Sequence, residues 1–112
     1  MTQNSNVLDQ LYSVIQNRKG DNPKTSYTAE LLSQGMPKIV QKVGEEAVEV
    51  ITAALVENEN KVIEESADLL YHMLVLWAHK GVTPENVWNE LRRREGISGV
   101  LEKTSRQKIL KE

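Results

Sequence analysis

The chain has 112 residues, which suits one domain spanning residues 1–112 and leaves no length for a second. Its 14 Lys and Arg residues stand against 16 Asp and Glu residues, so the net charge of −2 gives no electrostatic case for nucleic acid or an anionic membrane as the main partner. It contains no cysteine, which excludes disulfides, thiolate zinc sites and cysteine nucleophiles.

Neither end nor middle of the sequence shows a targeting or membrane segment. Residues 1–6 are polar and uncharged, where a signal peptide would begin with basic residues. The longest apolar stretch, residues 69–78, contains His72 and is far shorter than a membrane span of about 20 residues. We therefore expect a soluble, cytoplasmic protein.

The spacing of apolar residues predicts helices nearly throughout, with no convincing alternating strand. The first helix is expected over about residues 6–17, followed by a loop over residues 18–24 that is rich in turn residues. Ser26 or Thr28 is expected to cap a short helix, which Gly35 ends.

Two long helices follow, the first over about residues 37–57 and the second from a polar turn at residues 57–60 to Lys80, where Gly81 ends it. The second is apolar on nearly all sides over residues 69–78, a pattern typical of a helix buried on several sides. A helix of about 20 residues is roughly 30 Å long, too long for the short first helix to cover. We therefore expect a symmetric homodimer; the alternative is cover by the first and fifth helices of the same chain.

The fifth predicted helix begins with Thr83 as N-cap and Pro84 at the first helical position, and it ends near Gly96. Residues 97–112 are polar and rich in lysine, and we expect them to be frayed or only partly helical. The fold class is therefore all-α, a bundle of four to five helices completed by dimerisation.

The most informative pattern is a pair of acidic motifs, Glu46/Glu49 and Glu65/Asp68, each inside an otherwise apolar helical run. Residues three apart lie on the same side of a helix, about 5–6 Å apart at Cβ. An antiparallel hairpin folded at the polar turn brings the two pairs level, and four carboxylates at that range require protons or cations. Oxygen ligands alone favour magnesium, with manganese as a substitute, over zinc or copper. The alternative is an ordinary set of surface acids, of which Lys42 and Glu46 would form an i,i+4 pair.

Other polar residues near this hairpin each have two interpretations. Lys38 and Lys42 precede the acids on one helix face, where they either hold phosphate oxygens or only offset the clustered negative charge. His72 follows Asp68 by one turn and either serves the site or is a tolerated polar residue at its rim. The Ser-Tyr-Thr segment at residues 26–28, taken alone, suits capping and packing.

Taken together, these motifs closely resemble the phosphoribosyl-ATP pyrophosphohydrolase family. The resemblance rests on Gln-Lys-Val-Gly-Glu-Glu-Ala-Val-Glu-Val at residues 41–50 and Glu-Glu-Ser-Ala-Asp-Leu-Leu-Tyr-His at residues 64–72, and it covers most of the chain. The four-acid motif alone identifies only the wider all-α, MazG-like superfamily of NTP pyrophosphohydrolases. The Ser-Tyr-Thr segment and the Gln-Lys-Val-Gly-Glu-Glu run point to its histidine-biosynthesis branch.

The resemblance implies an all-α dimeric enzyme that hydrolyses phosphoribosyl-ATP to phosphoribosyl-AMP and pyrophosphate, the second step of histidine biosynthesis. It implies four acidic ligands for a magnesium ion, an accessory acid, and a substrate-binding segment at residues 26–28. We expect the accessory acid to orient or deprotonate the attacking water, and the two lysines and the histidine near the hairpin to bind the substrate as well. The metal ligands are Glu46, Glu49, Glu65 and Asp68; the accessory acid is Glu45; and the expected substrate-binding residues are Ser26, Tyr27, Thr28, Lys38, Lys42 and His72.

Two other functions remain open from the sequence. One is a house-cleaning pyrophosphohydrolase that acts on nucleoside or deoxynucleoside triphosphates, which a substrate panel would separate from the histidine-pathway enzyme. The other is a non-enzymatic helical dimer whose acids are structural, which predicts no magnesium-dependent stabilisation and no turnover of any triphosphate.

Overall fold

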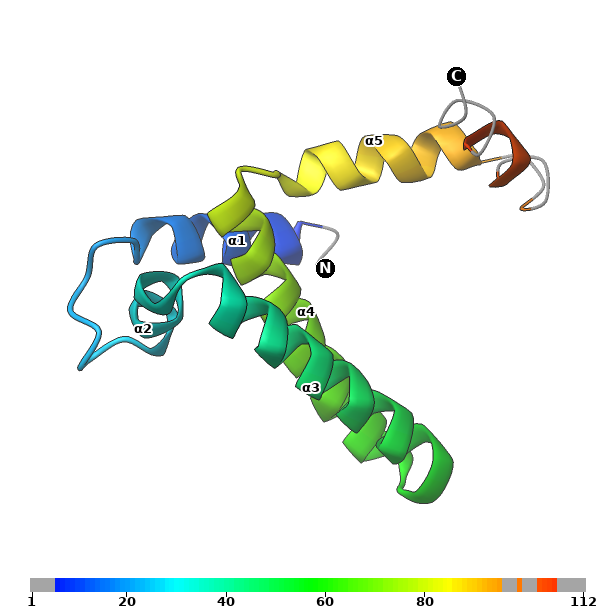
Figure 1. Ribbon diagram of the computed structural model, residues 1–112. Helices are drawn as coiled ribbons and strands as arrows, with labels where there is room; N and C mark the ends of the chain where they lie inside the picture. The colour runs from blue at the N-terminus through cyan, green and yellow to red at the C-terminus, as the bar shows by residue number, and fades with distance from the viewer. Residues whose placement is uncertain (1–5, 96–98, 100–102, 107–112) are drawn as a thin grey trace.

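The computed structural model describes residues 6–95, Gly99 and residues 103–106, and every regular element in this part of the chain is a helix. Figure 1 shows five of them in chain order: α1 (Val7–Asn17), α2 (Tyr27–Gln34), α3 (Met36–Val56), α4 (Glu59–Lys80) and α5 (Pro84–Arg94). The predicted all-α class is confirmed, and the predicted helix bounds agree to within about two residues. Most of the predicted frayed tail lies outside the described residues; inside it, Gly99 and residues 103–106 are helical.

Local capping explains where the helices begin and end. Ser26, not Thr28, caps α2, because its hydroxyl accepts a 3.1 Å hydrogen bond from the backbone N–H of Ala29. Gly35, at φ 85°, lies between α2 and α3 and allows the sharp corner that separates them by one residue. Asn58 caps α4, and Gly81 ends it in the left-handed conformation. The hydroxyl of Ser26, expected at the substrate, is therefore used as a cap.

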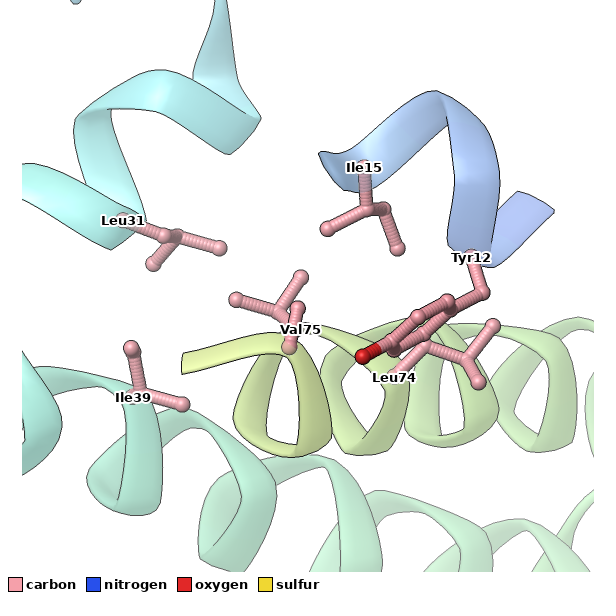
Figure 2. Packing of buried hydrophobic residues seen from close by; sticks show 7 residues of the cluster. Tyr12, Ile15, Leu31, Ile39, Leu74 and Val75 are labelled. Carbon is pink, nitrogen blue, oxygen red and sulfur yellow. The ribbon is translucent and has the colours of Figure 1, made fainter. Parts of the chain in front are cut away.

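The two long helices, α3 and α4, form the predicted antiparallel hairpin and lie side by side along their length (Figure 1). The shorter helices α1 and α2 pack at one end of it, α1 on the C-terminal half of α4 and α2 on both α3 and α4. Figure 2 shows that the core lies there, where apolar side chains of four helices meet. Its largest fully buried side chains are Ile15, Leu31, Ile39, Leu74 and Val75. The opposite end of the hairpin extends beyond this core.

The apolar surface of the hairpin is only partly covered within one chain. On α4 the structure buries His72, Leu74, Val75 and Ala78. Along the outer face of α3 runs an apolar stripe that is 45 to 77 % exposed, formed by Val40, Val48, Ile51 and Leu55. Ile63 and Leu70 on α4 are exposed too. The bare apolar surface thus belongs to both long helices, whereas the sequence pattern had singled out α4.

Helix α5 does not cover the hairpin. It extends away from α3 and α4 and meets the rest of the chain near α1 and the end of α4 (Figure 1). Trp88 of α5 contacts Trp77 of α4, and the two rings lie edge-on with centroids 6.2 Å apart. Helix α5 therefore contributes this contact to the cover of α4, and the homodimer stays a prediction. No helix in the described residues is long and apolar enough to cross a membrane.

Candidate metal and substrate site

Three carboxylates from the two long helices converge on one point. Glu46 and Glu49 lie three residues apart on α3, and the antiparallel packing brings Glu65 of α4 opposite them. One oxygen from each lies within 4.8 Å of the others. Glu46 is buried, at 6 % exposure, Glu65 is half-buried and Glu49 is exposed. We call these three residues the acidic triad; the fourth predicted ligand, Asp68, is exposed on α4 and lies outside this group.

The electrostatics of the triad fit a cation. The pKa of Glu65 is raised above 4.5 by a hydrogen bond with Glu49, by burial, and by the negative charges of Glu49 and Asp68. Glu65 Oε1 is buried and has no hydrogen-bond partner among the described residues. A buried carboxylate oxygen without a partner is costly unless a proton or a cation satisfies it. Because the triad offers only oxygen ligands, a hard divalent cation suits it best.

Lys42 forms ion pairs with Glu46 of the triad and with the neighbouring Glu45. Its ammonium nitrogen lies 3.4 Å from Glu45 Oε1 and 3.5 Å from Glu46 Oε2. Burial lowers the pKa of Lys42, but Tyr27 and the two glutamates outweigh this and raise it. Glu45 also accepts a 2.9 Å hydrogen bond from Gln41 Nε2, which, with Lys42, lowers its pKa. The i,i+4 pair considered as a surface feature therefore exists, but one of its partners is buried.

A hollow of about 300 Å³ opens between α2 and α3, beside Lys42. Three residues expected at the substrate line it: Tyr27, Lys38 and Lys42. The rest of its lining was not expected from the sequence and consists of Glu30, Leu31 and Gln34. The sequence contains a pattern that could have indicated this lining, because positions 27, 30, 31 and 34 share one face of a short helix. The hollow combines two ammonium groups with an aromatic ring, a suitable wall for a phosphorylated ligand.

The start of α2 is joined to α4 by two side-chain hydrogen bonds. Tyr27 Oη lies 2.9 Å from His72 Nε2, and Thr28 Oγ1 is hydrogen-bonded to Tyr71 Oη. His72 Nδ1 in turn lies 2.7 Å from the backbone oxygen of Asp68. Burial raises the pKa of Tyr27, which Lys42 partly offsets. Of these residues expected at the substrate, Tyr27 lines the hollow, whereas Thr28 and His72 are hydrogen-bonded to the protein.

Comparison with known proteins identifies the family. The model of the family described as phosphoribosyl-ATP pyrophosphohydrolase matches residues 8–95, more than half of the chain. The chain belongs to this family. It is 56 % identical over 108 residues to a phosphoribosyl-ATP pyrophosphatase of Paramagnetospirillum magneticum. The aligned region covers 96 % of this chain and 99 % of that relative. It is 58 % identical over 102 residues to the Rhodospirillum rubrum enzyme of the same name, covering 91 % of this chain and 87 % of that relative.

The family match includes the whole site. The acidic triad, the hollow and the two hydrogen bonds between α2 and α4 all fall within residues 8–95. A third relative, the phosphoribosyl-ATP pyrophosphatase of Azospirillum brasilense, is 54 % identical over 101 residues, or 90 % of this chain and 91 % of its own. The resemblance seen in the sequence motifs is thereby confirmed at the level of the family.

Proposed function

We propose that this chain hydrolyses phosphoribosyl-ATP to phosphoribosyl-AMP and pyrophosphate with a magnesium ion at the acidic triad, as a step of histidine biosynthesis. Family membership supports the substrate, because the relatives bear the name of this activity. The convergence of the triad, with Glu65 Oε1 buried and without a partner, is the observation that carries the chemistry. Such a cluster is unfavourable unless it holds a proton or a cation, and a divalent cation offsets more of the negative charge.

Glu46, Glu49 and Glu65 would hold the ion, and Asp68 is the fourth ligand that the motif implies. Asp68 acts electrostatically on Glu65, which supports its inclusion. Magnesium, with manganese as a substitute, fits a set of carboxylate oxygens without histidine or cysteine. When bound there, the ion would supply positive charge that offsets the negative charge shifting to the leaving pyrophosphate.

Lys38 and Lys42 have different roles in the site. Lys42 is held by Glu45 and Glu46, so its first role is to fix these carboxylates in place. Lys38 lies one helical turn earlier in the wall of the hollow, and within the described part of the chain no ion pair holds its ammonium group. Lys38 is therefore the cation available to the outer phosphates of the substrate.

Glu45 is our candidate for orienting or deprotonating the attacking water. Gln41 and Lys42 hold its carboxylate next to the triad, and the Glu45 side chain stays 47 % exposed to water. Its lowered pKa keeps it ionised at neutral pH, so it accepts hydrogen bonds from water. A carboxylate in hydrogen-bond reach of the nucleophilic water is the arrangement that general-base catalysis requires.

We also propose that the chain is a homodimer. The stripe of Val40, Val48, Ile51 and Leu55 occupies one face of α3 at helical spacing, and the neighbouring helix adds Ile63. Contiguous apolar surface of this kind marks a protein interface in a monomer that would otherwise expose it to water. A second copy of the chain fits it, because the same stripe on both partners is self-complementary in a two-fold dimer.

The direct test is a substrate panel. Pyrophosphate release from phosphoribosyl-ATP, ATP and dCTP is measured with magnesium and with a chelator in its place. We expect release from phosphoribosyl-ATP only, and only with magnesium. Equal turnover of ATP or dCTP would identify a house-cleaning enzyme instead, and no turnover of any of the three would favour structural acids.

A further inference from the structure

His72 is buried beside the site and has both ring nitrogens occupied by the protein. It is 6 % exposed, its Nε2 lies 2.9 Å from Tyr27 Oη, and its Nδ1 lies 2.7 Å from the backbone oxygen of Asp68. Its ring packs edge-on against Tyr27 and Tyr71, with centroids 5.8 and 5.0 Å away. No nitrogen of His72 is left for a ligand, which argues against the substrate contact expected from the sequence.

The chemistry of its partners fixes the tautomer of His72. A backbone carbonyl only accepts hydrogen bonds, so Nδ1 carries the hydrogen and donates it to Asp68. In the neutral ring Nε2 is then an acceptor, and the Tyr27 hydroxyl donates to it. The hydrogen bonds run in one direction, from Tyr27 through His72 to the backbone of Asp68.

This chain of hydrogen bonds connects the two halves of the site. Tyr27 lines the hollow together with Lys38 and Lys42, on the side expected to hold phosphates. Asp68 belongs to the acidic motif of α4 and acts on Glu65 of the triad. His72 is the only residue described here that is hydrogen-bonded to both Tyr27 and Asp68.

We propose that His72 is a positioning residue, which orients Tyr27 in the wall of the hollow and fixes it relative to the helical turn that carries Asp68. It does so without touching the substrate. A tyrosine ring turns about two side-chain torsions, and a fixed acceptor for its hydroxyl selects one orientation. This proposal rests on the proposed function, because it assigns a task within the same site.

The kinetic test compares His72→Asn, Tyr27→Phe and the double variant in phosphoribosyl-ATP turnover. Asn keeps a donor near the position of Nδ1 but removes the acceptor at Nε2. We expect each single variant to lose roughly tenfold in kcat/KM, as for one hydrogen bond. The double variant should be no worse than the poorer single variant, because both changes break the same contact. Multiplicative losses would mean that His72 acts on the substrate by itself, which would overturn the proposal.

Tyr71→Phe is the matched control. It removes the neighbouring hydrogen bond between α4 and Thr28 of α2 but keeps the ring that stacks on Tyr27 with centroids 6.2 Å apart. We expect it to lower Tm about as much as His72→Asn does, while kcat/KM stays within about twofold of wild type. If both variants lost Tm and kcat/KM in the same proportion, His72 would be merely structural and the proposal wrong.

A second readout does not depend on activity. The chain has only two histidines, His72 and His79, and the exposed His79 can be replaced by Gln to leave one imidazole signal. Long-range ¹H–¹⁵N spectra of His79→Gln, recorded at a pH where the His72 ring is neutral, should show its hydrogen on Nδ1 and none on Nε2. Protonation at Nε2 alone would overturn the proposal even in an active enzyme. A wild-type chain without phosphoribosyl-ATP turnover would instead refute the proposed function, whichever tautomer is found.

Discussion

Lys42 Nζ lies 3.5 Å from Glu46 Oε2 on the next turn of α3, and Glu46 is buried at 6 % exposure. An i,i+4 pair at the surface contributes a few tenths of a kcal/mol. A pair with one buried partner matters more, because removing the other leaves a buried charge without compensation. In this protein the buried charge also belongs to a cluster of three carboxylates, so its orientation affects the whole site.

Replacing each lysine by methionine separates their two tasks. Lys42→Met leaves Glu46 unpaired, so we expect a loss of about 1–2 kcal/mol in the free energy of unfolding, discounted because Lys42 is partly exposed. Lys38→Met should leave Tm near the wild-type value but raise KM for phosphoribosyl-ATP roughly tenfold, as for one lost charged contact. Thermal melting and steady-state kinetics measure both effects. Unchanged melting of Lys42→Met would contradict the structural task of that residue.

Glu65→Gln tests the triad as a metal site. The amide removes the repulsion between Glu65 and Glu49, so the metal-free variant should melt no lower than wild type. Magnesium should raise the Tm of wild type but not that of the variant, and kcat/KM should fall by roughly 100-fold or more. Glu64→Gln is the control, because Glu64 is exposed and pairs with Lys61 instead. A variant that gained as much Tm from magnesium as wild type does would refute the assignment of Glu65.

The acidic triad was predictable because its geometry is local. A spacing of three residues fixes Glu46 and Glu49 on one face of a helix, and a tight antiparallel hairpin leaves little freedom for Glu65 opposite them. The contact between Tyr27 and His72 was not predictable in this way. These residues are 45 positions apart, and they meet only because the eight-residue α2 packs on α4. No periodicity within a single element encodes such a contact.

The same difference explains what the sequence missed about the surface. The apolar composition of α4 predicted hydrophobic surface that one chain leaves bare, but within residues 69–78 only Leu70 is an exposed large hydrophobic, and most of the bare surface lies on α3. Which apolar faces of α3 and α4 stay exposed to water depends on how α1, α2 and α5 pack against them, and the sequence of one helix does not determine this packing. The exposed stripe of α3, including Ile51 and Leu55, has the same helical spacing as a buried core face, so its sequence could not reveal its exposure.

Glu90 on α5 supports a pH-dependent prediction that is independent of the metal. Hydrogen bonds from Arg93 and Arg94 lower its pKa from 4.5 to about 2. A lowered pKa contributes stability that is fully present above the unfolded value and is lost as the pH falls towards the folded value. Glu90→Gln should therefore melt below wild type at pH 7, and the difference should disappear as the pH falls from about 4.5 towards 2. A difference that stays constant over this range would show that the ion pairs contribute nothing to stability.

The apolar stripe of α3 gives the prediction for the oligomer. Ile51 is 57 % exposed in the isolated chain, and a dimer that uses the stripe would bury it. Wild type should then have a mass near twice 12.7 kDa by light scattering, and its Tm should rise with protein concentration. Ile51→Glu should shift the mass towards 12.7 kDa, because a charge in a dry interface lacks a partner. Val14→Glu is the control, since Val14 lies on α1 with a similar exposure of 46 % but outside the stripe. A monomeric wild type at micromolar concentration would contradict the dimer, and dissociation by Val14→Glu alone would move the interface from α3 to α1.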